Sequence, residues 1–366
     1  GNSNLWNTYM KKIRATNYFL SKVAPQVEQG KISGNASRVR HYLGEVYFFR
    51  AYIYFTALRD FGDFPIVKKV VEENYDSVRV ASQRRPRNEV ARFILSDLDR
   101  AYQLMTNVPP MTNRLTRDCA ALMKSRVALF EGTWEKYHRG TAFVPGGKQW
   151  PGANVEYLKH FTIDIDKEIQ YFLQQAVEAA VIVASSHSLH HDYAALFNSV
   201  DLSDMSEVLL WRRYGLQAGN TSHHWVVSYL QRNGCGNAGL SKSFVDSYLM
   251  KTGLPVYAAG SQYQGDDTYQ HVFDQRDPRM DKTILKTNDL LSTSPNLIEY
   301  IKKSDGYGYF YRSPIFEGEV ENSCPTGYSL RKGLNTDGSM QPTKESFTGC
   351  PIFRAAEAYL NYIEAY

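Results

Sequence analysis

Side chains that could hold a metal ion are few and poorly spaced. The histidine pairs His190–His191 and His223–His224 are adjacent in the sequence, whereas a helix-borne metal site places its ligands four residues apart. Asp164, Asp166 and Glu168 imitate the start of a calcium loop, but the glycine expected at its sixth position is missing. The pattern favours polar surface roles for these residues. We therefore expect no metal site and no cofactor.

Catalytic motifs are missing from the sequence as well. It contains no G-x-S-x-G elbow, H-E-x-x-H zinc motif, phosphate-binding loop or Rossmann glycine pattern. Glu317, Glu319 and Glu321 alternate and would share one face of a strand. Glycoside hydrolysis instead needs two carboxyl groups that face each other across a cleft. We expect no catalytic residue, and a protein that is not an enzyme.

Aromatic residues in irregular segments offer a different chemistry, the binding of a sugar. A sugar presents a C–H face to an aromatic ring and hydroxyl groups to amide, carboxylate and guanidinium side chains. Three segments combine such residues without helical periodicity, on loops where binding residues concentrate. The candidate stacking residues are Trp150, Trp225, Tyr307 and Tyr309, and the candidate polar residues are Asn220, Asp305 and Arg312. The alternative for each ring is a place in a small local core.

Composition limits the class of protein. The 366 residues include 43% hydrophobic and 22% charged residues, which are values typical of globular proteins. A net charge of +4, without a block of like charges, gives no reason to expect nucleic acid as a partner. The short basic cluster at 84–87 is expected to be solvated surface. No apolar run is long enough to cross a bilayer as a helix.

The four cysteines, at positions 119, 235, 324 and 350, form no C-x-x-C pair. Cys119 lies in a helical pattern and is expected in the core. A disulfide among Cys235, Cys324 and Cys350 stays open at this point, because such a bridge needs an oxidising compartment.

The first half of the sequence has the periodicity of long helices, and we expect them at 6–23, 38–61, 88–105, 117–130 and 166–184. Pro25 should end the first helix, Gly62 the second, and Thr116 should cap the fourth. Trp6 and Trp134 lie on these patterns and are expected in the core.

The helix at 38–61 is unusually apolar around Arg50. We expect protein to surround it on nearly every side and to bury Tyr47, Phe49, Ile53, Tyr54 and Leu58. Arg50 should then pair with an internal carboxylate or carbonyl group, because a buried charge needs a partner.

A mainly α fold follows, with a tetratricopeptide-like scaffold of helical hairpins and an irregular lobe of short strands and loops. The scaffold should comprise residues 1–200 and the ligand-binding lobe residues 201–350, the latter opening on a strand near 207–211. Residues 351–366 should start a returning helical segment, and we expect the chain to be a fragment of a longer protein.

Several motifs occur in a characteristic order. The most distinctive is GEVYFFRAYIYF at 44–55, which is followed by FGDFP at 61–65. Others are the Trp6 to Asn17 helix pattern, ILSDLDRA at 94–101, RLT at 114–116 with RVAL at 126–129, SEVLL at 206–210, RDPR at 276–279, GY at 327–328 before RK at 331–332, and PIFRAAE at 351–357. Together they resemble the SusD/RagB family over nearly the whole chain. Arg276, Asp277 and Arg279 in this set are expected to form a salt-bridged turn.

The resemblance implies a SusD-like, surface-exposed lipoprotein of the bacterial outer membrane. Such proteins capture an extracellular glycan and deliver it to a SusC-type TonB-dependent transporter. The resemblance also implies an N-terminal lipid anchor and final helical hairpins, and we expect both to lie outside this sequence. The alternative is that the same scaffold captures peptide or another nutrient.

Overall fold

The computed structural model describes residues 3–109, 111, 113–215, 239–293, 301–302, 309–310, 324–341 and 346–366. It divides into two compact units. The first comprises Gly1–Leu189, Ser206–Leu210 and Ile352–Tyr366, and the second comprises His190–Met205 and Trp211–Pro351. The fold is mainly helical with few strands, as predicted.

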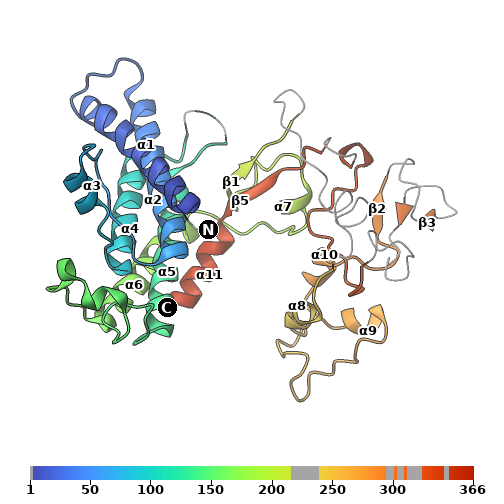
Figure 1. The fold of residues 1–366 in the computed structure, drawn as a ribbon. Helices are drawn as coiled ribbons and strands as arrows, with labels where there is room; N and C mark the ends of the chain where they lie inside the picture. The colour runs from blue at the N-terminus through green and yellow to red at the C-terminus, as the bar shows by residue number, and fades with distance from the viewer. Residues whose placement is uncertain are drawn as a thin grey trace. The chain divides into compact units, whose positions relative to one another are not determined.

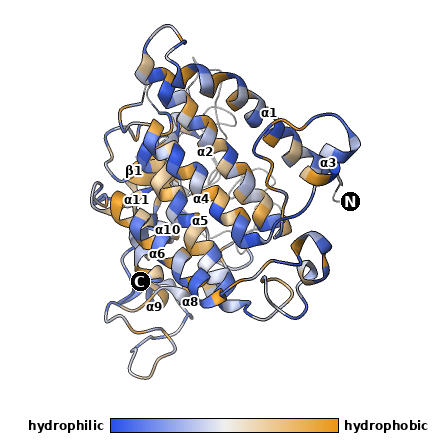
Figure 2. Cartoon of the chain, turned by 90° about the vertical axis from the view of Figure 1, so that its left-hand side faces the viewer, coloured by the Kyte–Doolittle hydropathy of each residue, from blue (hydrophilic) through white to orange (hydrophobic). Residues whose placement is uncertain are grey.

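Long helices build the first unit (Figure 1). They are α1 (Ser3–Glu28), α2 (Ala36–Phe61), α4 (Arg87–Leu104), α5 (Arg117–Tyr137), α6 (Ile165–Ala184) and α11 (Ala355–Ala365), with the short α3 (Tyr75–Ala81) between α2 and α4. Helix α1 packs on α2, α2 on α4, α4 on α5, and α5 on α6, while α11 contacts both α5 and α6. In Figure 2 these helices carry hydrophilic and hydrophobic residues in turn, as expected of helices that bury one face. No helix among the described residues is both long and apolar enough to cross a membrane.

The expected helices are all present, with changes at their ends. Asn35, Thr116 and Asp164 each accept a hydrogen bond from a backbone N–H in the first turn of a helix, which caps α2, α5 and α6. Helix α2 ends at Gly62, as predicted. The predicted stop before Pro25 is wrong, since α1 continues to Glu28. Pro25 lies in the last turn, where it has no N–H to donate to the carbonyl one turn earlier, and the helix ends three residues later.

Two further elements, α3 and β5, differ from the prediction. Helix α3 was not predicted, and none of its residues is buried, so no apolar period marks it. Residues 350–354 form the strand β5 (Cys350–Arg354), which pairs with β1 (Val208–Arg212), and α11 begins only at Ala355. The strand near 207–211 is confirmed as β1.

Helix α2 shows both a success and an error of the sequence analysis. Tyr54 and Leu58 are buried in the core of the first unit, and Tyr47 and Ile53 are half-buried. Phe49, however, is 50% exposed, so the expectation of a helix surrounded on nearly every side is wrong. Aromatic residues occupy three successive positions, 47–49, and a helix turns successive side chains to different sides. One of them therefore faces solvent.

Arg50 has the internal partner that was predicted. Its Nε and Nη2 donate to the two carboxylate oxygens of Asp97, both at 2.7 Å, and its Nη1 donates to Asn17 Oδ1 at 2.8 Å. Both members of the ion pair are buried. The pair joins α2 to α4, and losing one partner would leave a buried charge uncompensated.

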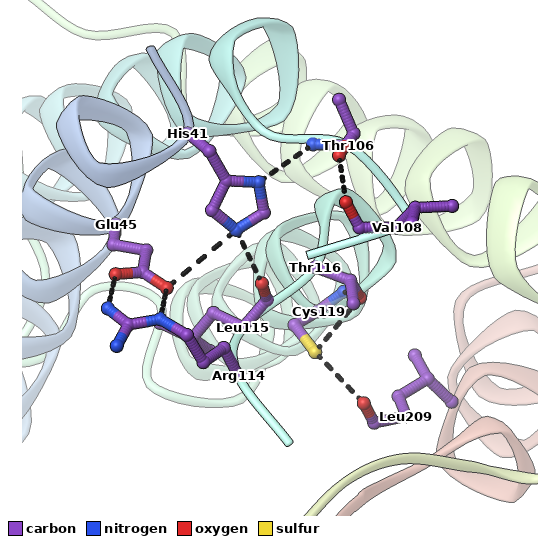
Figure 3. Close-up of polar contacts among 9 residues, drawn as sticks. All are labelled: His41, Glu45, Thr106, Val108, Arg114, Leu115, Thr116, Cys119 and Leu209. Carbon is purple, nitrogen blue, oxygen red and sulfur yellow. Dashed lines mark hydrogen bonds and ion pairs between the residues drawn. The ribbon is translucent and has the colours of Figure 1, made fainter. Parts of the chain in front are cut away.

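The N-terminal half of α2 is tied to the loop that precedes α5 (Figure 3). His41 Nδ1 accepts a bond from the Thr106 N–H at 3.3 Å, so the proton is on Nε2, which donates to the Leu115 carbonyl at 3.0 Å. Glu45 accepts two bonds from the Arg114 guanidinium. These bonds fix where α5 begins.

The described cysteines are free thiols. Cys119 is fully buried, as predicted, and its thiol donates to the Leu209 carbonyl at 3.6 Å (Figure 3). Burial raises the pKa of this thiol to about 11, which makes it a poor nucleophile. Cys324 and Cys350 are free, so they form no bridge with each other, and Cys235 lies outside the described residues.

Short elements make up the described part of the second unit. Its helices are α7 (Ala195–Asn198), α8 (Lys242–Ser247), α9 (Tyr269–Phe273) and α10 (Met280–Thr283), and its antiparallel sheet has the order β2 (Leu290–Ser292), β4 (Tyr309–Phe310), β3 (Ile301–Lys302). A small core contains Val245, Val272, Met280, Ile284 and Tyr328.

The RDPR turn lies beside this small core. Asp277 and Arg279 form the expected ion pair. Arg276 does not join it, because its buried guanidinium donates to the carbonyl groups of Val245, Tyr248 and Val272 at 2.7, 2.9 and 3.2 Å. Arg276 therefore connects α8 and α9 through their backbones.

Candidate functional site

A hollow of about 440 Å³ opens in the first unit, and we call it the Asp63 hollow. It lies where the end of α2, the residues before α4, the end of α5 and the segment 142–158 meet. Its volume lies within the range of small-molecule sites. The aromatic residues that line it are Phe61, Trp134, Phe143, Trp150 and Tyr157, and the charged ones are Arg59, Asp60, Asp63, Arg84 and Arg87.

Asp63 stands at the turn that ends α2. The turn needs Gly62, whose φ of 68° lies in the left-handed region that favours glycine. Asp63 Oδ1 accepts a bond from the Arg87 backbone N–H at 2.9 Å, and Oδ2 accepts one from the Trp150 indole nitrogen at 2.7 Å. Burial raises the pKa of Asp63, while these bonds and the charges of Arg87 and Arg84 act against that rise.

Arg87 forms the inner wall of the hollow. Its Nε and Nη2 donate to the two carboxylate oxygens of Glu131, each at 2.7 Å, and both side chains are buried. The guanidinium lies over the Trp134 ring, 4.5 Å from its centroid. Trp134 is half-buried and stacks on His138, with 4.1 Å between ring centroids. These contacts make the wall rigid, and they correct the expectation that the whole 84–87 cluster is solvated.

The outer part of the hollow has side chains free to meet a ligand. Phe143 is 62% exposed and Tyr157 is 39% exposed. Arg59 and Arg84 are exposed too, each lying against a ring, Phe55 and Trp6 respectively. The exposed Asp60 accepts a bond from the Tyr9 hydroxyl. The arrangement can therefore stack on an apolar face and exchange hydrogen bonds with hydroxyl groups.

Trp150 is the one predicted site residue whose side chain the structure describes. It belongs to the first unit and is 4% exposed. Its ring packs on Phe161, with centroids 5.4 Å apart, and lies so close to Gly152 that a Cβ there would overlap it. Trp150 thus supports the wall of the hollow, and its contact with a ligand stays a prediction.

The side chains of the other predicted site residues are not described, so their positions cannot be compared with the hollow. Asn220, Trp225, Asp305, Tyr307 and Arg312 lie outside the described residues. Tyr309 lies in β4, opposite Lys302 of β3. Conversely, the sequence analysis did not single out Arg59, Phe143 or Tyr157, and it noted Arg84 only as part of a solvated basic cluster. The glycines near Trp150 drew attention to a segment that lines the hollow, but the arginines come from elsewhere in the chain.

The described residues contain no group of three acidic, histidine or cysteine side chains that could hold a metal ion. His190 and His191 stack on each other, and His223 and His224 lie outside the described part. Asp164 caps α6, and Glu168 accepts two bonds from Arg92.

Comparison with known family models agrees with the resemblance found in the sequence. The model of the SusD family matches residues 206–366, and a SusD-like model described as starch-binding and associating with the outer membrane matches residues 1–129. The chain belongs to the SusD/RagB family. Proteins of the SusD family are non-catalytic binding proteins. No curated protein sequence matches the chain.

Solved structures of SusD-like proteins share the fold. One from Bacteroides fragilis NCTC 9343 aligns with all of this chain and 64% of its own, at 18% identity and a TM-score of 0.63. A SusD-like carbohydrate-binding protein from the same strain aligns over 98% and 60% of the two chains, at 16% identity and a TM-score of 0.63.

A third structure contains a xylogluco-oligosaccharide and aligns over 98% of this chain and 59% of its own, at 18% identity and a TM-score of 0.56. The chain therefore spans 59% to 64% of the length of these three structures.

Proposed function

We propose that this protein captures an extracellular glycan without altering it. The observation that carries the proposal is the outer part of the Asp63 hollow, where the exposed rings of Phe143 and Tyr157 lie beside Arg59, Asp60 and Arg84. A pyranose needs this combination, because its C–H face stacks on a ring while its hydroxyl groups need donors and acceptors. Membership of a carbohydrate-binding family supports the same ligand class.

The hollow of the first unit is, by itself, one proposed contact region. The second unit carries a separate set of proposed contacts, which are the predicted residues Trp225, Tyr307, Tyr309, Asn220, Asp305 and Arg312. Because each ring contributes about 1 kcal/mol, affinity should be modest and shared among several contacts.

We further propose that the protein works at the cell surface. The family description of association with the outer membrane supports this location. There the glycan would be delivered to a SusC-type TonB-dependent transporter, and an N-terminal lipid anchor would hold the full-length protein to the membrane. Co-purification of a transporter with the lipid-anchored protein from solubilised outer membranes tests the partner. A protein that is recovered alone under mild detergent would contradict it.

A glycan array followed by product analysis tests the ligand. The proposal predicts that at least one oligosaccharide is retained and is recovered with its length unchanged. Shortened products would indicate an enzyme. Retention of peptides without any glycan would favour peptide capture by the same scaffold.

A further inference from the structure

Two guanidinium groups of the Asp63 hollow form no ion pair with a carboxylate of the described residues. Within the part of the chain that the structure describes, no carboxylate lies in ion-pair distance of Arg59 or Arg84, although most described arginines have one. Both side chains are exposed and line the hollow. Each is held against an aromatic ring, Arg59 at 5.2 Å from Phe55 and Arg84 at 5.2 Å from Trp6. Cation–π contact of this kind positions a guanidinium and leaves its N–H donors available.

The other charges of the lining are already engaged. Arg87 is compensated by Glu131 in a buried, two-bond pair. The carboxylate of Asp63 accepts bonds from Trp150 and from the Arg87 backbone. Asp60 keeps acceptor capacity beside its bond from Tyr9, because an ionised carboxylate has about four acceptor positions. The open part of the hollow therefore offers the two cationic donors of Arg59 and Arg84 beside the acceptor Asp60.

We propose that the Asp63 hollow selects a sugar that carries a carboxylate, that is, a uronic acid unit of an acidic glycan. This inference rests on the proposed function and names its ligand class. The planar carboxylate of the sugar binds Arg59 and Arg84, since guanidinium groups match carboxylate geometry. Asp60 accepts a bond from a ring hydroxyl, and Phe143 or Tyr157 covers the C–H face. A free inorganic anion would use the arginines but neither the acceptor nor the rings.

A panel of paired oligosaccharides tests the inference. Each pair joins an acidic oligosaccharide, such as an oligogalacturonate, oligomannuronate or oligoguluronate, with the same oligosaccharide after reduction of its carboxyl groups. We expect at least one acidic member to bind about tenfold more tightly than its reduced counterpart. The preference should shrink in high salt, because both arginines are exposed and their charge is screened.

Substitutions then connect the preference to the hollow. Arg84→Gln and Arg59→Gln should each reduce it severalfold, while Arg79→Gln should leave it unchanged. Arg79 is a matched control, because it is an exposed arginine on α3 that does not line the hollow. Circular dichroism of all three variants checks that they fold.

The outcomes separate this inference from the proposed function. Equal or tighter binding of the reduced members, or a preference that survives both arginine substitutions, overturns the acidic ligand while glycan capture stands. Absence of binding to acidic and neutral glycans alike overturns both. Tight binding of sulfated oligosaccharides alone would overturn the carboxylate in favour of a different anion.

Discussion

The indole nitrogen of Trp150 donates a hydrogen bond to Asp63 at 2.7 Å, which joins residues 87 positions apart in the sequence. Asp63 ends the turn after α2, and Trp150 belongs to the segment that follows α5. This bond therefore holds together the two sides of the hollow. It also explains why a tryptophan among glycines lies in a wall and not on an exposed loop.

Replacement of Trp150 by phenylalanine tests this bond. The change keeps most of the buried ring but leaves Asp63 Oδ2 without its donor, so the free energy of unfolding should fall by about 1–3 kcal/mol. Trp134→Phe is the control, because its indole donates a longer bond, 3.4 Å, to the carbonyl of exposed Phe143 and should cost less. Urea unfolding of both variants gives the comparison. Equal losses would contradict a special role for the Asp63 bond.

A buried carboxyl group without a partner lies behind the same wall. Among the described residues, neither carboxyl oxygen of Glu135 has a hydrogen-bond partner, and the side chain is fully buried. Burial raises the pKa of Glu135 to about 9, and the neighbouring carboxylates of Glu131 and Glu168 add to the rise against the charges of Arg87 and Arg92. Glu131 and Glu168 each accept two bonds from an arginine, and no cation in the described part of the chain forms an ion pair with Glu135.

The raised pKa makes the stability of the first unit depend on pH. Below pH 4.5, the ordinary pKa of the group, Glu135 is protonated in both the folded and the unfolded state. Its ionisation then does not change the free energy of unfolding. Between pH 4.5 and about 9 the unfolded chain releases the proton and the folded chain does not, so stability falls as pH rises. Glu135→Gln removes this cost and should raise the free energy of unfolding by on the order of 2 kcal/mol at pH 8.

Chemical unfolding of Glu135→Gln and the wild type at pH 5 and pH 8 measures the effect. The advantage of the variant should be large at pH 8 and small at pH 5. Glu364→Gln, on an exposed position of α11, should show no advantage at either pH. An advantage independent of pH would mean that Glu135 does not titrate as described.

The sequence predicted the helices well because their signals are local. The partner of Arg50 shows the limit: an arginine in an apolar helix implies an internal partner, but Asp97 is 47 residues away and only packing selects it. Periodicity also could not say which of the aromatic residues on α2 faces solvent. For the hollow, the sequence analysis named one lining residue, Trp150, whose contact with a ligand stays a prediction. The meeting of Arg59, Arg84 and Tyr157 depends on how α2, α4 and the 142–158 segment pack.

Two neighbouring tyrosines of α2 test that packing. Tyr54 is fully buried, and its hydroxyl accepts a bond from the Val67 N–H at 2.8 Å, so Tyr54→Ala should cost about 3–5 kcal/mol. Tyr52 is 48% exposed, and Tyr52→Ala should cost less than about 1 kcal/mol. Thermal unfolding followed by circular dichroism distinguishes the two. Similar losses in both variants would contradict the described orientation of α2.

The most direct test of glycan capture is the affinity of a variant that lacks both exposed rings of the hollow. Calorimetry would compare Phe143→Ala/Tyr157→Ala with wild type, using the oligosaccharide that binds most tightly on the array. Tyr75→Ala is the control, because Tyr75 is 80% exposed on α3 and does not line the hollow. At about 1 kcal/mol for each ring, the double variant should bind about thirtyfold more weakly at an unchanged unfolding temperature. Affinity equal to that of the wild type and the control would contradict the hollow as a glycan site.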